Sequence, residues 1–294
     1  MKRIFLFVVT NIAVLLMLGF VAQALCAFFG TSLAEVVGPN ASSLLIYAVV
    51  YGMLGSVISL LMSKQMAKMS CHAKTIDGTE GEVERWLVDT VRELADRANL
   101  KMPEVAIYPG AANAFATGAF RNSALVAVST DIMSQMSREE LRAVLGHEMS
   151  HVANGDMVTL TLVQGVLNAF VIVVSRVLAS VIANGSKGES RRNNNGLYFL
   201  LVMVLQIALG ILASLIVMWF SRKREYAADA GSAKLLGTPS AMIAALRRLG
   251  NLQPGTLPDS LRAMGIAEGK KTSIWSTHPS IEDRIEALQN FGAG

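Results

Sequence analysis

Residues 147–151 have the sequence HEMSH, in which two histidines lie four residues apart and a glutamate directly follows the first. In a helix, positions i and i+4 are neighbours on one face, so the rings of His147 and His151 can reach one metal ion. Glu148 lies one step round the helix, where its carboxylate can reach a metal-bound water without binding the metal itself. The spacing therefore indicates metal-assisted hydrolysis.

The flanking residues predict the helix that this spacing requires. Ser137 and Glu140 form a capping box at its start, and Asn154-Gly155 is typical of a helix end. An apolar stripe runs along the same helix and leaves the two histidines on a neighbouring face. The alternative is an exposed helix surface on which two of the four histidines of the chain lie by chance.

A catalytic zinc usually has a third protein ligand besides a water molecule. No further histidine closely follows His151, so the third ligand comes from elsewhere. In SRKREYAADAGSAKLLG, residues 221–237, Glu225 and Asp229 stand one helical turn apart. Glu225 can bind the metal, while Asp229 can accept the free ring N–H of a ligand histidine. On spacing alone, a solvated helix whose carboxylates balance Arg222, Lys223 and Arg224 is an equal alternative.

The composition is too apolar for a soluble protein of 294 residues, with 52% hydrophobic residues and a mean hydropathy of +0.45. Apolar blocks long enough to cross ~30 Å of hydrocarbon account for the excess. They are Ile4–Phe29, Ala41–Met62, Met157–Asn184 (with Arg176 as its one charge) and Leu197–Phe220. We therefore expect four transmembrane helices. The first block is too long for a typical cleaved signal peptide, which favours an uncleaved anchor.

Basic residues near the ends of these blocks predict the orientation. Basic residues precede the first block and follow the second and the fourth, and all of these positions lie on one side of the membrane. That side is expected to be the cytoplasm, and the residues are Lys2, Arg3, Lys64, Lys68, Lys74, Arg222, Lys223 and Arg224. Lys187, Arg191 and Arg192 disagree, so the third and fourth blocks form either full spans or a hairpin that dips into the membrane. The net charge of +4 then fits an anionic membrane surface better than nucleic acid.

These blocks divide the chain into a transmembrane hairpin at 1–62, a polar segment at 63–156, a second hairpin at 157–220 and a polar segment at 221–294. The polar segments face one side and form one α+β domain, in which we expect helices at 82–99 and 280–290. A small sheet is expected from 104–109 and 123–130, on either side of NAFATG. Because His151 and Glu225 lie within six residues of the second hairpin, both are expected near the same membrane face.

Several motifs together resemble one family: HEMSH, the following NGD, the apolar hairpin, SRKREYAADAGSA and THPSIEDRI at 277–285. This combination is similar to the HtpX family of bacterial membrane proteases, gluzincin-type metallopeptidases related to the type I CAAX prenyl proteases. The resemblance implies an endopeptidase with one Zn²⁺ per chain and four transmembrane helices in the bacterial inner membrane. Its active site faces the cytoplasm, and it cleaves damaged or misassembled membrane proteins in quality control and the stress response.

The resemblance also assigns residues. It implies that His147, His151 and Glu225 bind zinc, that Glu148 is the catalytic base and that Asp229 supports a ligand histidine. NAFATG resembles the edge strand beside the family's cleft, so Asn113 and Ala114 are expected to pair with the substrate backbone; an ordinary turn is the alternative. His278 resembles a histidine that stabilises the oxyanion, its alternative being a residue that merely precedes a helix.

Two rival functions remain at this point. A non-catalytic membrane scaffold or holdase with a structural zinc would not need Glu148. An intramembrane protease would carry HExxH inside a span, but Glu139, Glu140, Arg142 and Asp156 flank this motif, which indicates a helix in contact with water. The ligand types favour Zn²⁺ without excluding other divalent ions.

Overall fold

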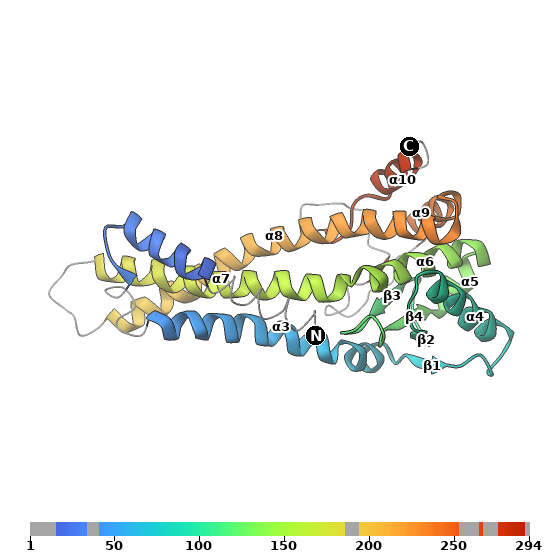
Figure 1. Cartoon of the computed structure of the whole chain (residues 1–294), viewed down its shortest axis with the longest axis horizontal. Helices are drawn as coiled ribbons and strands as arrows, with labels where there is room; N and C mark the ends of the chain where they lie inside the picture. The colour runs from blue at the N-terminus through green and yellow to red at the C-terminus, as the bar shows by residue number, and fades with distance from the viewer. Residues whose placement is uncertain (1–15, 34–40, 186–193, 253–264, 267–275, 292–294) are drawn as a thin grey trace. The chain divides into compact units, whose positions relative to one another are not determined.

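The computed structural model describes residues 16–33, 41–185, 194–252, 265–266 and 276–291 (Figure 1). The chain divides into two compact units. The first comprises Met1–Ile58 and Thr161–Val217, and the second comprises Ser59–Leu160 and Met218–Gly294.

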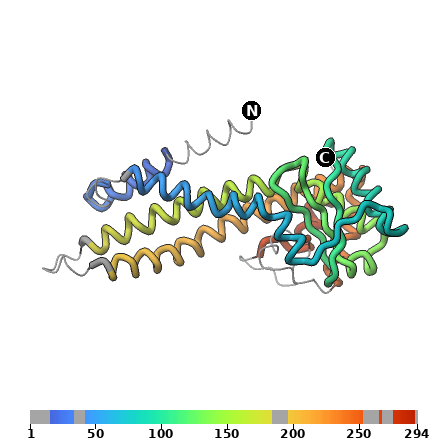
Figure 2. Tube along the Cα trace, turned by 90° about the horizontal axis from the view of Figure 1, so that it is seen from below, coloured from blue at the N-terminus to red at the C-terminus, as the bar shows by residue number. Residues whose placement is uncertain are grey.

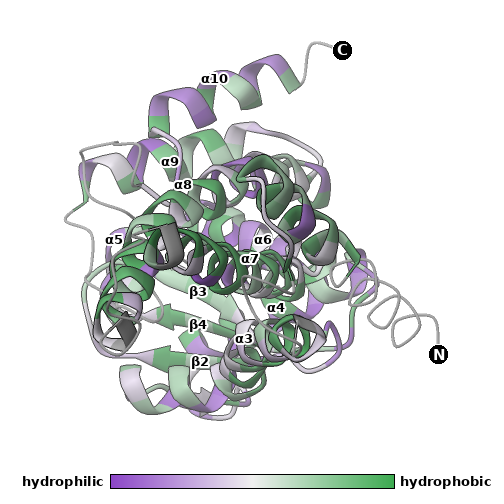
Figure 3. Cartoon of the chain, turned by 90° about the vertical axis from the view of Figure 1, so that its left-hand side faces the viewer, coloured by the Kyte–Doolittle hydropathy of each residue, from purple (hydrophilic) through white to green (hydrophobic). Residues whose placement is uncertain are grey.

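Three helices in the described part of the chain are long and apolar enough to cross a membrane. They are α3 (Ala41–Cys71), α7 (Asp156–Gly185) and α8 (Asn194–Leu236), and apolar residues dominate all three (Figure 3). The first predicted block appears as a shorter apolar helix, Leu16–Phe28, because residues 1–15 lie outside the described residues. In the described residues, three of the four predicted transmembrane helices are therefore long and apolar enough to cross a membrane.

In the first unit, α3 and α7 lie side by side (Figure 1 and Figure 2). They approach closely through the small residues Gly52 and Ala169. A Cβ on Gly52 would lie 2.5 Å from the backbone nitrogen of Ala169, so only glycine fits at this contact. The Arg176 guanidinium carbon lies 4.3 Å from the centre of the Tyr47 ring. Close approach through small residues is typical of helices packed in a membrane.

The outward surface of α8 is also that of a membrane helix. Only 11% of its most apolar window is buried inside the protein, compared with 44% for α7. Large apolar side chains such as Phe199 and Ile207 are exposed along it. An apolar surface of this length is stable only when another apolar medium covers it. The protein is therefore a membrane protein.

The second unit contains a mixed sheet in the order β1-β2-β4-β3. Its strands are β1 (Lys74–Ile76), β2 (Glu104–Tyr108), β3 (Ala114–Thr117) and β4 (Leu125–Ser129). Strands β2 and β4 are parallel, and the other two pairs are antiparallel. The two strands predicted on either side of NAFATG are confirmed. NAFATG itself contains β3, and β1 is a strand that we did not predict.

The edge of β3 that faces away from β4 is covered at one point by the chain itself. Phe115 forms an antiparallel bridge with Gly265, and the Ile266 N–H donates to the Ala114 carbonyl at 3.0 Å. Ile266 is only 3% exposed and belongs to the same apolar core as Ala114 and Ala116. Within the described residues, this contact is what pairs the outer edge of β3.

The helices of this unit are α4 (Glu82–Arg97), α5 (Thr130–Gln135), α6 (Arg138–Asn154), α9 (Ser240–Asn251) and α10 (Ile281–Phe291). Helix α6 packs against β3, α4 and α9. The predicted capping box is present, and Gly155 ends α6 in a left-handed conformation with φ 73°. The expectation that this helix is in contact with water holds for its first turns and for Asn154 at its end, but residues 143–152 between them are all buried.

Candidate metal centre

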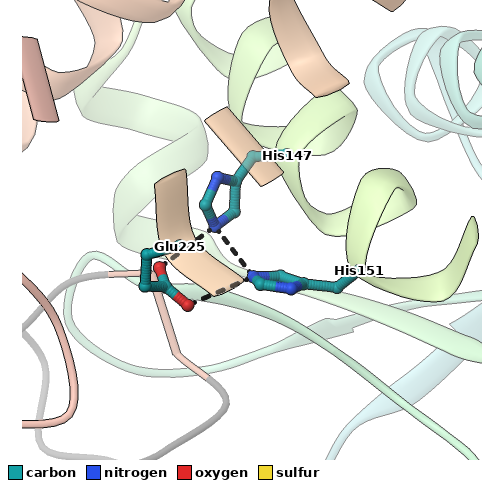
Figure 4. Close-up of side chains that lie close together, drawn as sticks. All are labelled: His147, His151 and Glu225. Carbon is teal, nitrogen blue, oxygen red and sulfur yellow. Dashed lines mark hydrogen bonds and ion pairs between the residues drawn. The ribbon is translucent and has the colours of Figure 1, made fainter. Parts of the chain in front are cut away.

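His147 and His151 on α6 and Glu225 on α8 converge on one point (Figure 4). The two histidine Nε2 atoms are 3.1 Å apart. Glu225 Oε1 lies 3.3 Å from Nε2 of His151, and Oε2 lies 3.4 Å from Nε2 of His147. All three side chains are buried. The structure thus brings together the three residues predicted to bind the metal, two from before the second predicted hairpin and one from after it.

The outer nitrogen of each histidine meets a carboxylate. Nδ1 of His147 lies 2.8 Å from Asp229 Oδ1, and Nδ1 of His151 lies 2.6 Å from Asp156 Oδ2. When each Nδ1–H donates to its carboxylate, each Nε2 carries a lone pair, and the two lone pairs face one another beside Glu225. Such an arrangement is unfavourable unless a cation lies between the donors. These residues therefore fit a metal ion.

The electrostatics of the cluster agree with this interpretation. Burial acts to lower the pKa of His151, but Glu225 and Asp156 outweigh it and raise the pKa to about 10. Burial acts in the same direction on His147, where Asp229 and Glu225 raise the pKa instead. The carboxylates therefore make this point favourable for positive charge, which a divalent ion can supply in place of protons.

Small residues allow α6 and α8 to approach closely enough to form this cluster. A Cβ on Gly146 would lie 2.8 Å from Ser232 Oγ, and a Cβ on Gly231 would lie 2.7 Å from the Cβ of Ser150. Both serine hydroxyls donate back to α6, Ser150 to the Gly146 carbonyl and Ser232 to the Ala143 carbonyl, each at 2.7 Å. Gly146, which directly precedes HEMSH, and Gly231 of DAGSA therefore allow α6 and α8 to cross closely.

Arg284 on α10 is a further member of the site that the sequence analysis did not identify. Its Nε donates to Asp229 Oδ2 at 2.8 Å, and its Nη2 donates to Oδ1 at 2.7 Å. The side chain is 1% exposed. One sequence signal was available, because Arg284 shares the buried stripe of α10 with Leu288. An arginine in an apolar stripe needs buried partners, and here the partner is the carboxylate that holds His147.

Glu148 is also completely enclosed, at 1% exposure. Burial raises its pKa to about 7, although His147 and His151 act to lower it. No described residue forms a well-aligned hydrogen bond to either carboxylate oxygen, although the Ala116 N–H of β3 is near enough to lower the pKa. Burial therefore favours the protonated form of this carboxylate more than water would, and the two histidines oppose that effect.

The structure places His278 against the third predicted ligand. Its Nδ1 lies 2.8 Å from Glu225 Oε2, and the side chain is buried. Helix α10 begins three residues later, at Ile281, with Ser280 accepting from the Asp283 N–H. His278 therefore belongs spatially to the metal cluster, although its role stays a prediction.

Asn113 and Ala114 lie at the start of the edge strand. The Asn113 N–H donates to Ser129 Oγ at 3.0 Å, and its carbonyl accepts from the Ser129 N–H. The Ala114 N–H donates to Asn113 Oδ1 at 2.9 Å, and its carbonyl accepts from Ile266. Their position is that of a strand edge rather than a turn, but their backbone groups are engaged within the chain.

Comparisons with known proteins agree with the site. The model of peptidase family M48 matches residues 82–291. Relatives named "Protease HtpX homolog" match along their whole length. The protein from Neisseria meningitidis serogroup C is 54% identical over 99% of this chain and 100% of its own, and that from Verminephrobacter eiseniae is 53% identical over 99% of both chains.

A solved structure, the crystal structure of Ste24p from S. mikatae, has a similar fold. It matches with a TM-score of 0.59 at 18% identity, over 98% of this chain and 67% of its own. The family match covers both the HEMSH helix and the helix with Glu225. The chain therefore belongs to peptidase family M48 and is a membrane metallopeptidase of the HtpX type.

Proposed function

We propose that this protein is a zinc endopeptidase in which His147, His151 and Glu225 bind the ion. The observation that carries the proposal is the convergence of both Nε2 atoms on the Glu225 carboxylate, with each Nδ1 held by a further carboxylate. Two imidazoles, one carboxylate and an open position are the ligand set of catalytic zinc sites. When bound, the ion activates a water molecule and polarises the peptide carbonyl.

Glu148 acts as the base. It follows His147 directly, so it lies beside the metal without being one of the converging ligands. A buried carboxylate whose oxygens have no well-aligned donor among the described residues is able to take a proton from water and return it to the leaving amine. His278, which lies against Glu225, is the candidate for stabilising the oxyanion.

The substrates that we propose are damaged or misassembled membrane proteins, in quality control and the stress response. Two features support this: the apolar helices keep the enzyme in the membrane, and β3 offers an edge with which an extended chain can pair. Pairing at Ala114 requires the substrate to replace the Ile266 N–H. Unfolded segments with free backbone groups are suited to that exchange.

The decisive experiment measures cleavage of an unfolded protein by the purified full chain in detergent with zinc restored. Glu148→Gln is compared with Glu139→Gln, an exposed carboxylate on the same helix. We expect all three proteins to hold one zinc per chain, and only Glu148→Gln to lose cleavage. If Glu148→Gln cleaves as well as the parent, the mechanism is wrong. If all hold zinc and none cleaves, the metal is structural and the scaffold alternative is favoured.

We further propose that the chain crosses the bacterial inner membrane four times, with the segments 63–156 and 221–294 in the cytoplasm. Both cysteines are buried, so introduced cysteines can be labelled with a membrane-impermeant maleimide on intact cells. Lys187→Cys lies between the third and fourth apolar blocks and should react, whereas Lys101→Cys should react only after lysis. Equal labelling of both would contradict this topology and favour a hairpin that does not cross.

A further inference from the structure

Arg224 belongs to the run of basic residues that the sequence suggests for contact with lipid, but its surroundings are different. Its side chain is only 7% exposed. Nη1 donates to the Asp156 carbonyl at 3.0 Å, and Nη2 donates to Ser221 Oγ at 3.2 Å. The adjacent Lys223, by contrast, is exposed, with its ammonium 4.2 Å from the Trp219 ring. Arg224 is therefore committed to protein contacts.

Arg224 donates to the backbone of Asp156, whose carboxylate contacts the ring of His151. Asp156 is buried, and its Oδ2 lies 2.6 Å from Nδ1 of His151. It is the first residue of α7 and follows Gly155, whose left-handed conformation ends α6 and makes a turn between the two helices. Without a hold on its backbone, a residue just after such a turn would keep its carboxylate in place less well.

We propose that Arg224 and Asp156 form a clamp that positions two metal-binding residues at once. Asp156 orients the His151 ring, and Arg224 fixes the Asp156 backbone to α8, one residue before Glu225. Arg224 is thus a positioning residue that acts through Asp156. This inference rests on the proposed metal centre and adds a requirement to it: the distance between His151 and Glu225 depends on a contact that includes neither side chain.

The change in zinc affinity on replacing Arg224 distinguishes the clamp from a purely electrostatic role. The clamp predicts weaker binding, whereas a purely electrostatic role predicts tighter binding. A positive charge beside a cation site weakens the binding of a divalent ion, so the loss of that charge alone would strengthen binding. Loss of the clamp misplaces ligands and weakens binding. Outer residues that orient metal ligands typically contribute ~10–100-fold to affinity.

The experiment is a titration of Zn²⁺ into the metal-free full chain in detergent, in competition with a chromophoric chelator. We expect Arg224→Met and Asp156→Ala each to raise the Kd by ~10–100-fold. Asp156→Asn keeps an acceptor for the ring N–H and should lose less than Asp156→Ala. Arg224→Lys keeps one donor and should lie between Arg224→Met and the parent. Lys223→Met removes the same charge one residue away and should bind like the parent.

The clamp is wrong if Arg224→Met binds zinc as tightly as the parent or more tightly, or if Lys223→Met is weakened equally. If circular dichroism shows that Arg224→Met is unfolded, Arg224→Lys decides: an affinity equal to that of the parent then rejects the clamp. Failure of the proposed metal centre looks different, because the parent and Lys223→Met would then bind no zinc at all. Failure of the proposed catalysis alone would leave these affinities unchanged and would appear only as absent cleavage.

Discussion

At the scale of single residues, the centre depends on the balance of buried charge. Arg284 neutralises Asp229 through two hydrogen bonds, and its Nη1 lies 3.6 Å from Glu225 Oε2. Burial acts to lower the pKa of Arg284, and the carboxylates raise it instead. The arginine therefore stays charged, and Asp229 remains an acceptor for the His147 ring. Without that charge, Asp229 would have to protonate or leave its position.

We expect Arg284→Met to lower the free energy of unfolding by about 3–5 kcal/mol, because it leaves a buried carboxylate without its partner. Chemical denaturation of the full chain measures the change. Arg92→Met is the matched control, since Arg92 pairs with Asp89 at the surface and should contribute no more than about 1 kcal/mol. A loss for Arg284→Met as small as that of the control would show that the buried pair is not needed for stability.

At the scale of secondary-structure elements, the crossing of α6 and α8 determines whether the ligands meet. The helices approach through Gly146 and Gly231, each against a serine of the other helix. The Oγ atoms of these serines donate within 2.7 Å to carbonyls of α6, so they are not free to move away. An added methyl group at this crossing must push the helices apart.

Gly231→Ala should therefore destabilise the protein by about 1–3 kcal/mol and weaken zinc binding, although alanine is the better helix former. Gly210 lies on the same helix, but a Cβ added there would have no neighbouring atom within 4 Å. Gly210→Ala should therefore stabilise the protein or leave its stability and zinc affinity unchanged. Thermal unfolding and zinc titration of both variants provide the comparison. If the two variants behave alike, the close approach is not what forms the site.

The outer edge of β3 leads to a second prediction at this scale. Ile266→Pro removes the N–H that occupies the Ala114 carbonyl, and a hydrogen bond of about 1 kcal/mol corresponds to a roughly fivefold change. We expect KM for an unfolded substrate to fall by about that factor, with kcat unchanged because no catalytic group is altered. Ile266→Ala keeps the N–H and should not lower KM. A KM that is unchanged or raised in Ile266→Pro would mean that the contact serves only to stabilise the core.

At the scale of the whole molecule, the metal centre joins two distant stretches of chain. His147 and His151 come from 59–160, and Glu225 comes from 218–294; the two stretches form one unit although the segment between them belongs to the other. A bound ion is thus a cross-link between parts of the second unit. Such a link stabilises the folded state by an amount that grows with the logarithm of the ratio of free metal concentration to Kd.

We expect zinc to stabilise the second unit by about 4 kcal/mol when its free concentration is 1,000 times the Kd. Differential scanning calorimetry with zinc and with a chelator measures the shift in Tm. Glu225→Ala should show a much smaller dependence on zinc, because it loses one of three ligands. An equal shift in that variant would indicate binding at other residues.

The sequence by itself determined the local features of this protein. The HEMSH spacing, the Ser137–Glu140 capping box and the helix end at Gly155 follow from the 3.6-residue period and from hydrogen bonds between near neighbours. The apolar blocks follow from composition alone. Glu225 and Asp229 could be identified as candidates because one helical turn separates them. All of these depend on residues that are close in the chain.

The tertiary structure decided which distant groups share a partner. Asp229 meets both His147 and Arg284, and Arg224 turns inward to Asp156 although its neighbours in sequence suggest a solvated basic run. Periodicity assigns a residue to a face of its own helix. Which helix covers that face depends on the packing of the whole core. A charged group that becomes buried there is stable only beside a group that pairs with it. For that reason, the metal-binding motif and Asp229 are visible in the sequence, whereas the roles of Asp156, Arg224 and Arg284 appear only in the fold.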